Sequence, residues 1–463
     1  MLTIKGLYKG VYDPFELNSI FLDTRSTFES LLPNTYQKGS FFSSIFDPIK
    51  YLFVNLIIEI IRTPKEYRFA LPNRYRDWFD NTLIFLSVSK NNQNALSLII
   101  KDVASKKDNI KIVNTGVGYH YFPVFWILIV STLYLPFFWN RLFKLPKSKR
   151  RIVLFNIRQY MMAPGTIWFL KRIMLKNKPE CIVLSNDHLF LTKGIELVCE
   201  EYGIKTIYVQ HASVSYAFPE LHFSYSFLDG MDSYEKYVYG DRKTHGSIFL
   251  LGAVRYDMLS TYRIQRKNNL RNCIGIAVNE LDDNCLVNKV CNELIERNPQ
   301  IKVKIRTHPR IKNNPFMFDN KERIMVVCAT DESITDYLDS IDIQISGDSG
   351  VHFDAIIGGV KTIAYNMSTT EYSDNYGYIK SGLVKYANTI DELMSLCYGY
   401  KFEPVGASLV RYYDESYGKE YAGHCSSIIS DFVLNNYDID YISKRYNMEV
   451  FGNNGKQYFK IVS

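Results

Sequence analysis

Short apolar runs alternate with helix-length segments from about residue 81 onward, and this alternation restricts the fold more than any other feature of the sequence. The first set of runs is TLIFLSVS, NIKIVNTG, RIVLFNI, CIVLSND and IKTIYVQH, at residues 82–89, 109–116, 151–157, 181–187 and 204–211. Continuous runs of Val, Ile and Leu bounded by polar residues are typical of strands that are covered on both faces. Strand–helix alternation predicts an α/β fold with a parallel, doubly wound sheet.

A second set of the same kind follows the charged, Asn-rich stretch YRIQRKNNLRN at Tyr262–Asn272, which is typical of a linker. Its predicted strands are NCIGIAVNE, QIKVKIRTHP, ERIMVVCAT, IDIQISGDSG and GVKTIAYN, between residues 272 and 366. Two consecutive Rossmann-like halves predict two lobes facing a central cleft, with ligands beyond the carboxyl ends of the strands. We therefore predict four parts: an N-terminal helical, membrane-proximal extension (1–80), a Rossmann-like acceptor domain (81–250), a Rossmann-like nucleotide-donor domain (251–435) and a tail that packs back (436–463).

The composition is that of a folded protein and is compatible with an anionic partner. Of the 463 residues, 47% are hydrophobic and 22% charged, so each domain can bury a core. The 55 Lys and Arg against 48 Asp and Glu give a net charge of +7, which suits a nucleotide, a phospholipid surface or a nucleic acid. On charge alone an ordinary basic protein fits equally well. We expect no nucleic-acid partner, because polar clusters at strand ends replace the basic stripes with interleaved aromatic residues that such binding favours.

The cysteines and the N-terminus bear on the compartment. The eight cysteines are scattered without a CxxC pair or metal-like spacing, and most lie in apolar runs, which favours a reducing cytosol. The first residues lack the basic and then apolar pattern of a secretion signal.

Two predicted strand ends in the second half carry polar clusters. KIRTHPR places a cation and a histidine directly after a strand, with a proline that forces the chain to turn. ISGDSGVHFD places small residues between a strand and a helix, where backbone N–H groups make an anion cradle, and an acidic residue one turn into that helix could reach ribose hydroxyls. For this loop alone, a turn followed by a helix cap is an equally good interpretation. The predicted donor-binding residues are Arg306, His308, Pro309, Gly347, Asp348, Ser349, Gly350 and Asp354.

The strand ends of the first half carry the sequences LSNDH and VQHAS. His211 is the candidate general base, because the pKa of histidine lies close to working pH. Asp187, at the neighbouring strand end, is a candidate base, nucleophile or orienting group. Gln210 and Ser213 are predicted to lie on the acceptor side. Two structural alternatives stand beside these roles: a hydrogen-bonded turn histidine and a helix-capping aspartate.

These residues carry a family resemblance. ISGDSGVHFDAIIGGVKTIAYN resembles the region of CDP-glycerol and CDP-ribitol polyolphosphotransferases in which a Ser-Ser pair precedes a helix with an acidic residue; Ser349 and Gly350 stand at the pair and Asp354 at the acidic position. RTHPR resembles the His–Pro element of these enzymes and of capsule sialyl- and Kdo-transferases. VLSND…YGIKTIYVQHASVSYAFPE is similar to the strand–helix–strand of capsule-polysaccharide transferases that ends in Gln-His-Gly, with Ala212 in place of the glycine. LLGAVRYD is similar to the segment that enters their second lobe.

The resemblance covers roughly residues 178–394 and implies a GT-B fold. It implies a nucleotide donor, of CMP or CDP type, on the C-terminal lobe and a glycan or lipid-linked acceptor on the N-terminal lobe. In this arrangement the donor is bound by His308, Ser349, Gly350 and Asp354, and the residues facing the reacting centre are His211 and Asp187. It also implies chemistry without a metal or other cofactor, because GT-B enzymes hold the pyrophosphate with helix dipoles and basic side chains. The sequence agrees, since its DID motif lies in the tail at Asp438–Asp440.

The uncharged segment Tyr121–Trp139 raises the question of a membrane, because it is long enough to span one. It lies between two predicted strands of one sheet, so we expect a crossover helix whose apolar face dips into the lipid interface. A second apolar stretch, Ser40–Pro64, is expected to contribute to the same face; burial of both segments as core helices is the alternative. The basic cluster after the first segment, Lys144, Lys147, Lys149, Arg150 and Arg151, favours an anionic surface. The predicted location is cytoplasmic, peripherally on the inner face of the cytoplasmic membrane.

The sequence suggests four alternative functions. The first is a glycosyltransferase that passes a sugar, such as CMP-activated Kdo or sialic acid, to a growing capsule, O-antigen or lipooligosaccharide. The second is a CDP-glycerol or CDP-ribitol polyolphosphotransferase, which would want cations such as Arg306 and Arg310 at the cleft. A sugar-nucleotide epimerase of related fold fits the DSG triplet, and a non-catalytic scaffold fits only the charge. The presence of both Asp187 and His211 favours glycosyl transfer.

Overall fold

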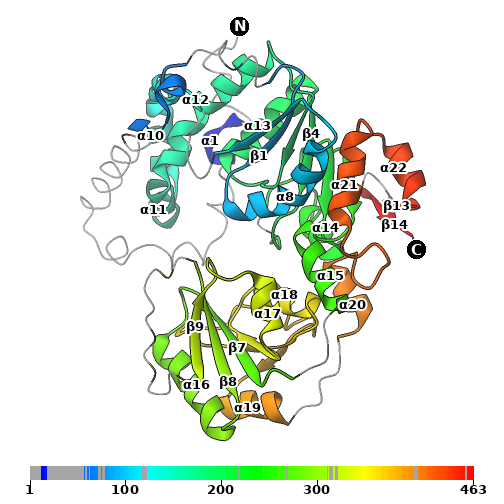
Figure 1. Cartoon of the computed structure of the whole chain (residues 1–463). Helices are drawn as coiled ribbons and strands as arrows, with labels where there is room; N and C mark the ends of the chain where they lie inside the picture. Colours follow the sequence, from blue (N-terminus) through cyan, green and yellow to red (C-terminus); the bar gives the residue numbers. More distant parts are fainter. Residues whose placement is uncertain are drawn as a thin grey trace.

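The structure, a computed structural model, describes residues 12–17, 57, 60–61, 63–70, 75, 79–115, 122–216, 218–242, 245–265, 270–309, 311, 316, 318, 322–399, 405–453 and 456–462. Among these residues the strands form two sheets, of eight and six strands, that build two lobes (Figure 1). The α/β fold class with two doubly wound parallel sheets is therefore confirmed. Most of the predicted extension 1–80, most of Ser40–Pro64, and Arg310 lie outside the described residues.

The first sheet has the strand order β13-β14-β6-β5-β4-β3-β1-β2, and its strands run parallel except for the β13–β14 hairpin. Counted along the chain, the first six strands take the order 2-1-3-4-5-6, which is the flavodoxin-like type with one strand added. The strands are β1 (Leu83–Ser87), β2 (Ile110–Asn114), β3 (Cys181–Leu184), β4 (Lys205–Val209), β5 (Tyr225–Leu228), β6 (Ser247–Leu250), β13 (Met448–Asn453) and β14 (Lys456–Ile461).

Helices cover both faces of the first sheet, and β1 shows the two cores on either side. Leu83 and Phe85 pack with residues of α8 and α21, whereas Ile84 and Leu86 pack with residues of α12 and α13, as the two-residue side-chain period requires. The helices of this lobe are α1 (Pro14–Leu17), α6 (Lys65–Arg68), α8 (Lys90–Ala104), α9 (Val124–Thr132), α10 (Leu135–Lys144), α11 (Lys147–Phe155), α12 (Ile157–Met174), α13 (Phe190–Tyr202), α14 (Met231–Tyr237), α21 (Cys425–Leu434) and α22 (Ile439–Arg445).

The second sheet is parallel throughout, with the order β12-β11-β10-β7-β8-β9. Counted from β7, this is 6-5-4-1-2-3, the classical Rossmann order. Its strands are β7 (Cys273–Val278), β8 (Lys302–Thr307), β9 (Ile324–Cys328), β10 (Ile343–Ser346), β11 (Lys361–Tyr365) and β12 (Lys385–Ala387). The helices of this lobe are η4 (Val254–Tyr256), α15 (Asp257–Gln265), α16 (Asn284–Arg297), α17 (Ile334–Asp339), α18 (Val351–Ile357), α19 (Ile390–Tyr398) and α20 (Ala407–Tyr413).

One predicted strand is wrong. Residues 151–157, expected to form the third strand, belong to α11 and the start of α12, and Ile152, Val153 and Leu154 are buried as helical residues. A short apolar run fits a buried helix as well as a buried strand, and periodicity alone cannot separate them. Here Pro146 stands at the N-cap of α11, so the chain is already helical when the run begins.

The five strands predicted for the second half all form, but several other strands were not predicted. β5, β6 and β12 have only three or four residues, too few for a clear pattern. The hairpin β13–β14 lies in the tail. Its sequence carries a usable signal, because Asn-Asn-Gly stands between two β-rich runs. Through this hairpin the tail joins the edge of the first sheet beside β6.

The chain passes between the lobes twice, and two aspartates connect the two crossing segments by hydrogen bonds. After β6 it continues into η4 and α15, and α15 packs against α17 and α18. After α20 it returns to α21, which lies beside α8 of the first lobe (Figure 1). Asp257 accepts hydrogen bonds from the backbone N–H groups of Cys425 (3.0 Å) and Ser426 (2.8 Å), and Asp414 accepts one from Ala253 (3.2 Å).

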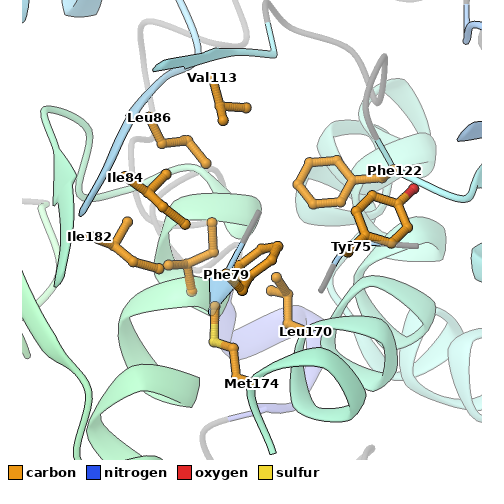
Figure 2. Close-up of a pocket in the computed structure, with 10 residues that line it drawn as sticks. Tyr75, Phe79, Ile84, Leu86, Val113, Phe122, Leu170, Met174 and Ile182 are labelled. Carbon is orange, nitrogen blue, oxygen red and sulfur yellow. The ribbon is translucent and has the colours of Figure 1, made fainter. Parts of the chain in front are cut away.

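The apolar cavity in Figure 2 lies in the core of the first lobe and is too small to be a ligand site. Its volume is about 20 Å³, and its lining residues are Tyr75, Phe79, Ile84, Leu86, Val113, Phe122, Leu170, Met174, Ile182 and Ile195. Ligand pockets have volumes of roughly 300–1,000 Å³ and a few convergent polar groups. This cavity is therefore not a candidate for the functional site.

The predicted crossover between β2 and β3 consists of more than one helix. The segment Tyr121–Trp139 contains α9 and much of α10, which are bent by 62° relative to each other. Within the part of the chain that is described, no helix taken singly has the length and apolar character to cross a bilayer, whereas α9 and α10 taken together do.

Candidate functional site

The predicted site residues follow strands at the switch points of the two sheets. In the first sheet the order reverses between β1 and β3, and Asp187 follows β3. In the second sheet it reverses between β7 and β10, and Gly347–Gly350 follow β10. Ligands of open α/β sheets bind at such points, outside the carboxyl ends of the strands, because the crossover helices there leave on opposite faces.

Asp187 is held as a buried carboxylate. Its Oδ2 accepts a hydrogen bond of 2.6 Å from the Tyr237 hydroxyl, and its Oδ1 lies 2.9 Å from Nδ1 of His188. Burial favours a raised pKa, but the hydrogen bond and charge of His188, together with Tyr237 and His211, lower the pKa of Asp187 below its usual value. Since both oxygens have partners, this arrangement suits the orienting role better than that of a nucleophile.

His211 follows β4, next to Asp187 in the sheet. Its ring lies 6.4 Å from that of His188, centroid to centroid, and its Nδ1 is buried without a hydrogen-bond partner among the described residues. Burial lowers the pKa of His211 to about 4; the negative charge of Asp187 opposes this shift, and the charges of His188 and Arg255 add to it. The imidazole is therefore neutral near pH 7, the state that a general base needs.

Gln210 and Ser213 flank His211 in different ways. The Gln210 side chain is buried: its amide nitrogen donates to the Ala212 carbonyl (2.9 Å) and to Ser233 Oγ (2.8 Å), and its Oε1 accepts from the Asp229 N–H (3.0 Å). It therefore shapes the loop that carries His211. Ser213 Oγ lies 3.3 Å from the hydroxyl of Tyr378, which belongs to the second lobe. The loop after β4 thus contacts both lobes.

Arg255, in η4 after β6, occupies the junction between the lobes. Its Nη2 forms an ion pair of 2.6 Å with buried Asp229, while its Nη1 is buried without a partner among the described residues. Burial opposes the charged form, but Asp229, Tyr256 and Asp354 raise the pKa of Arg255 well above its usual value. Burial raises the pKa of Asp229 to about 6, although Arg255 acts against this shift. The guanidinium therefore stays charged.

Asp354, on α18, connects Arg255 to the second lobe. Burial raises its pKa, against the opposing effects of Tyr256, Arg255 and Arg306. Arg306, at the end of β8, donates from Nη2 to the Glu332 carbonyl (3.1 Å), and its Nε is buried without a partner among the described residues. The charge of Arg255 lowers the pKa of His211, and the charge of Asp354 acts on both Arg255 and Arg306.

The loop after β10 is shaped by its neighbours. Buried His352 is held between the Gly347 carbonyl (2.8 Å from Nε2) and the Thr362 hydroxyl (2.6 Å from Nδ1), and burial lowers its pKa to about 4. A Cβ at Gly350 would meet open space, whereas one at Gly347 would lie 3.3 Å from Asp282 Oδ1. The loop is thus fixed from below by a neutral histidine and open beside Gly350.

Not all predicted donor residues of this lobe turn toward the junction. Asp348 Oδ2 accepts from Ser373 Oγ (2.9 Å) and from the backbone (2.8 Å) and side chain (2.9 Å) of Asn375, so it braces a neighbouring loop. Ser349 Oγ accepts from the Val351 N–H at 3.4 Å. His308 and Pro309 follow β8, and His308 Nδ1 lies 3.8 Å from Glu280 with 42% of its side chain exposed.

These contacts show that the loops after the carboxyl ends of both sheets meet at one junction, and that the chain crosses back to the first lobe at its end. The chain has a GT-B-like fold. No family model matches the sequence, and the comparison with curated proteins gives no match either.

Solved structures with partly similar chain paths include three enzymes. UDP-GlcNAc 2-epimerase from Neisseria meningitidis, bound to UDP-GlcNAc, is 13% identical with TM-score 0.47, over 76% of this chain and 100% of that one. Phytolacca americana UGT2, complexed with UDP-2fluoro-glucose and pterostilbene, is 10% identical with TM-score 0.45, over 77% and 100%. The wall teichoic acid polymerase TagF is 12% identical with TM-score 0.37, over 87% and 98%. Similarity at this level says nothing about chemistry, and the GT-B-like fold rests on the two sheets and their junction.

Sequence reasoning missed Arg255, Asp229 and Tyr378 as site residues. Arg255 lies within LLGAVRYD, which the resemblance already placed at the entrance to the second lobe, so the signal was available. Asp229 directly follows β5, a strand too short to be predicted, and its position at a strand end was therefore invisible. Tyr378 lies in the loop between β11 and β12 and carries no sequence signal.

Proposed function

We propose that this protein is a metal-independent glycosyltransferase of GT-B type that transfers a sugar from a nucleotide donor to a growing surface glycan. The favoured donor is a CMP-activated acid sugar such as Kdo or sialic acid, and the acceptor is a capsule, O-antigen or lipooligosaccharide chain. The observation that carries the proposal is Arg255, a half-buried cation whose Nη1 has no hydrogen-bond partner among the described residues and whose charge acts on both His211 of the first lobe and Asp354 of the second.

The proposed roles follow from the chemistry of each group. His211 accepts the proton of the attacking acceptor hydroxyl, and Asp187 stabilises the imidazolium that forms. Arg255 binds the phosphate of the donor and stabilises the negative charge that develops on the leaving nucleotide, which requires no metal ion. Asp354 interacts electrostatically with Arg255 and accepts hydrogen bonds from the donor ribose. Gly350 has no Cβ, which leaves space for the donor to approach the main chain of the loop.

The second candidate is a CDP-glycerol or CDP-ribitol polyolphosphotransferase. One observation favours it: Arg306 supplies a second partly buried guanidinium near Asp354, and transfer of a phosphoryl group needs cations around the reacting phosphate. In this reaction His211 would still take the proton of the attacking hydroxyl. The two candidates therefore differ in the donor and share the site.

A thermal-shift panel of CMP, CDP, UDP and GDP tests the proposed function. A nucleotide at 100 times its Kd stabilises the native state by about 2.7 kcal/mol, which raises the melting temperature measurably. We expect CMP and CDP to raise it and GDP to leave it unchanged. A rise with UDP alone would contradict a donor of CMP or CDP type, and no rise with any of the four would contradict nucleotide transfer. Turnover of CMP-sugars against CDP-glycerol, with and without EDTA, then separates the two candidates.

We also propose that the protein works on the inner face of the cytoplasmic membrane, where lipid-linked acceptors are found. The apolar side chains of α9 and α10 support this location, because several remain 38–59% exposed: Phe125, Ile129, Leu133, Phe137 and Phe143. Large apolar side chains that stay exposed on two consecutive helices favour an interaction site. Lys144, at the end of α10, is exposed beside it, and α11 adds further basic residues.

Co-sedimentation with vesicles tests the membrane location. The double substitution Leu133→Asp and Phe137→Asp removes two apolar side chains, each worth roughly 1.5–3 kcal/mol on full burial. We expect binding to phosphatidylglycerol-containing vesicles to weaken by at least about 100-fold. Leu270→Asp, at a residue that is 82% exposed outside this surface, is the matched control and should bind like the native protein. Equal binding of the double variant would rule out this surface as the contact.

A further inference from the structure

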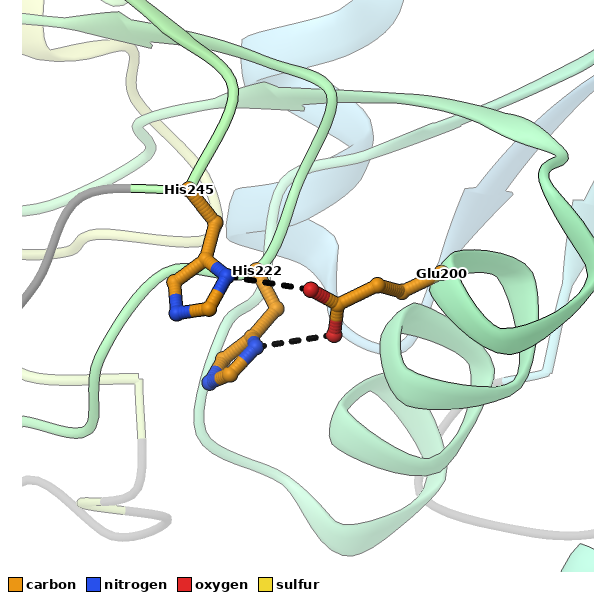
Figure 3. Close-up of side chains that lie close together, drawn as sticks. All are labelled: Glu200, His222 and His245. Atoms are coloured by element: carbon orange, nitrogen blue, oxygen red, sulfur yellow. Dashed lines mark hydrogen bonds and ion pairs between the residues drawn. The ribbon is translucent and has the colours of Figure 1, made fainter.

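Three potential metal ligands converge on the first lobe, outside the site described above (Figure 3). Glu200 lies near the end of α13, His222 in the loop before β5 and His245 in the loop before β6. The Glu200 carboxylate lies between the two rings: Oε2 is 2.9 Å from Nδ1 of His222, and Oε1 is 3.0 Å from Nδ1 of His245. The two imidazole rings stack with a centroid separation of 3.9 Å.

These distances are close to those that a metal ion requires. Zn–N and Zn–O bonds are about 2.0–2.1 Å long, so tetrahedral ligand atoms lie about 3.3 Å apart. The three ligand atoms of this cluster all lie within 4.8 Å of one another, and Figure 3 shows both Nδ1 atoms turned toward the carboxylate. Small rotations of the side chains would exchange the two hydrogen bonds for three bonds to one ion.

The types of ligand atom suit a divalent ion of intermediate hardness, such as zinc. Two imidazole nitrogens and one carboxylate oxygen select zinc and similar transition metals over magnesium or calcium, which prefer oxygen ligands. Oε2 of Glu220 lies 3.9 Å from Nε2 of His222 and can orient that ring from its far side.

We propose that Glu200, His222 and His245 bind one zinc-class divalent ion, with water as the fourth ligand, and that this ion fastens the loops before β5 and β6 to α13. The loops lie at the amino ends of parallel strands, at the edge opposite to the carboxyl ends that carry His211 and Asp187. The ion therefore stabilises the first lobe and takes no part in transfer. It is compatible with metal-independent catalysis, and its presence does not depend on the proposed function.

Zinc titration of the full-length protein tests the site. Protein stripped with EDTA and dialysed is titrated with zinc sulfate, and bound zinc and melting temperature are both measured. We expect one tightly bound equivalent and a higher melting temperature with zinc. Loss of a partner behind a ligand typically weakens metal binding 10–100-fold, so loss of a ligand itself, in Glu200→Gln or His245→Ala, should weaken it by more than about 100-fold.

The matched control is His424→Ala, which removes an exposed histidine from another part of the chain and should bind zinc like the native protein. Because a variant can also fail to fold, X-ray absorption of the native zinc-loaded protein provides an independent measurement, with two nitrogen ligands and one carboxylate oxygen expected. The proposal is overturned if the native protein takes up no zinc equivalent, or if Glu200→Gln binds zinc as tightly as the native protein. It is overturned equally if the melting temperature does not respond to zinc.

Discussion

The His211→Ala variant is expected to lose turnover by a factor of about 10²–10⁴ while it keeps its nucleotide affinity within about twofold. The factor is the usual contribution of a positioned general base, and the affinity should persist because the proposed donor-binding groups are Arg255 and residues of the second lobe. Steady-state turnover and isothermal titration with CMP provide the two measurements. His424→Ala is the control for removal of an exposed histidine, and should retain both properties.

The pH dependence gives the same prediction a second readout. Because the pKa of His211 is lowered to about 4, kcat/KM of the native enzyme should stay level near pH 7 and fall only as pH drops through about 4. Asp187→Asn removes a negative charge that raises the pKa of His211, so it should shift this acidic limb to still lower pH. A merely structural aspartate would leave the limb in place, and full turnover by His211→Ala would exclude the base assignment.

The lowered pKa of His211 also makes the free energy of unfolding depend on pH. His211 has a folded pKa of about 4 and an unfolded value near 6.5, so the unfolded chain binds more protons between these values. The contribution of His211 to the free energy of unfolding is therefore complete above about pH 6.5 and falls as pH drops toward 4. His211→Ala should lack this part of the acid destabilisation.

The Arg255→Gln variant is expected to show the second large effect, a loss of roughly 3–5 kcal/mol of stability together with nucleotide binding. Removing one partner of a buried ion pair leaves the other charge uncompensated, and here that charge is Asp229. The pKa of Asp229 is raised to about 6 even beside Arg255, so its charged form costs stability as pH rises above its unfolded value of 3.8. The deficit of Arg255→Gln should therefore be larger at pH 8 than at pH 5, as measured by urea unfolding.

A double variant separates stability from binding. Arg255→Gln combined with Asp229→Asn removes both charges and should recover most of the stability, because no buried charge is left unpaired. It should still fail to bind CMP, since it lacks the guanidinium that we propose to bind the phosphate. Normal nucleotide affinity in this double variant would show that Arg255 serves only the ion pair.

Several features of this protein were determined by the sequence itself. Continuous apolar runs predict all five of the longer strands of the second sheet, and the small and polar residues of SGDSG predict the loop after β10. These features are local: a strand covered on both faces must be apolar throughout, and a tight turn before a helix must be small or polar. A locally ambiguous run behaved differently, since residues 151–157 form helices because the chain before them is already helical.

The junction between the lobes was decided by the tertiary structure alone. Arg255 pairs with Asp229 because β5 and β6 are neighbours in the first sheet, and its charge acts on Asp354, 99 positions along the chain, because the loops of the two lobes meet. The sequence showed a polar residue at each strand end, but which of them are buried, which turn inward and which brace a loop, as Asp348 does, depends on neighbours from distant segments. Burial also sets the charge states of these groups. It lowers the pKa of His211 and raises the pKa of Asp229, and the charge of Arg255 acts on both groups.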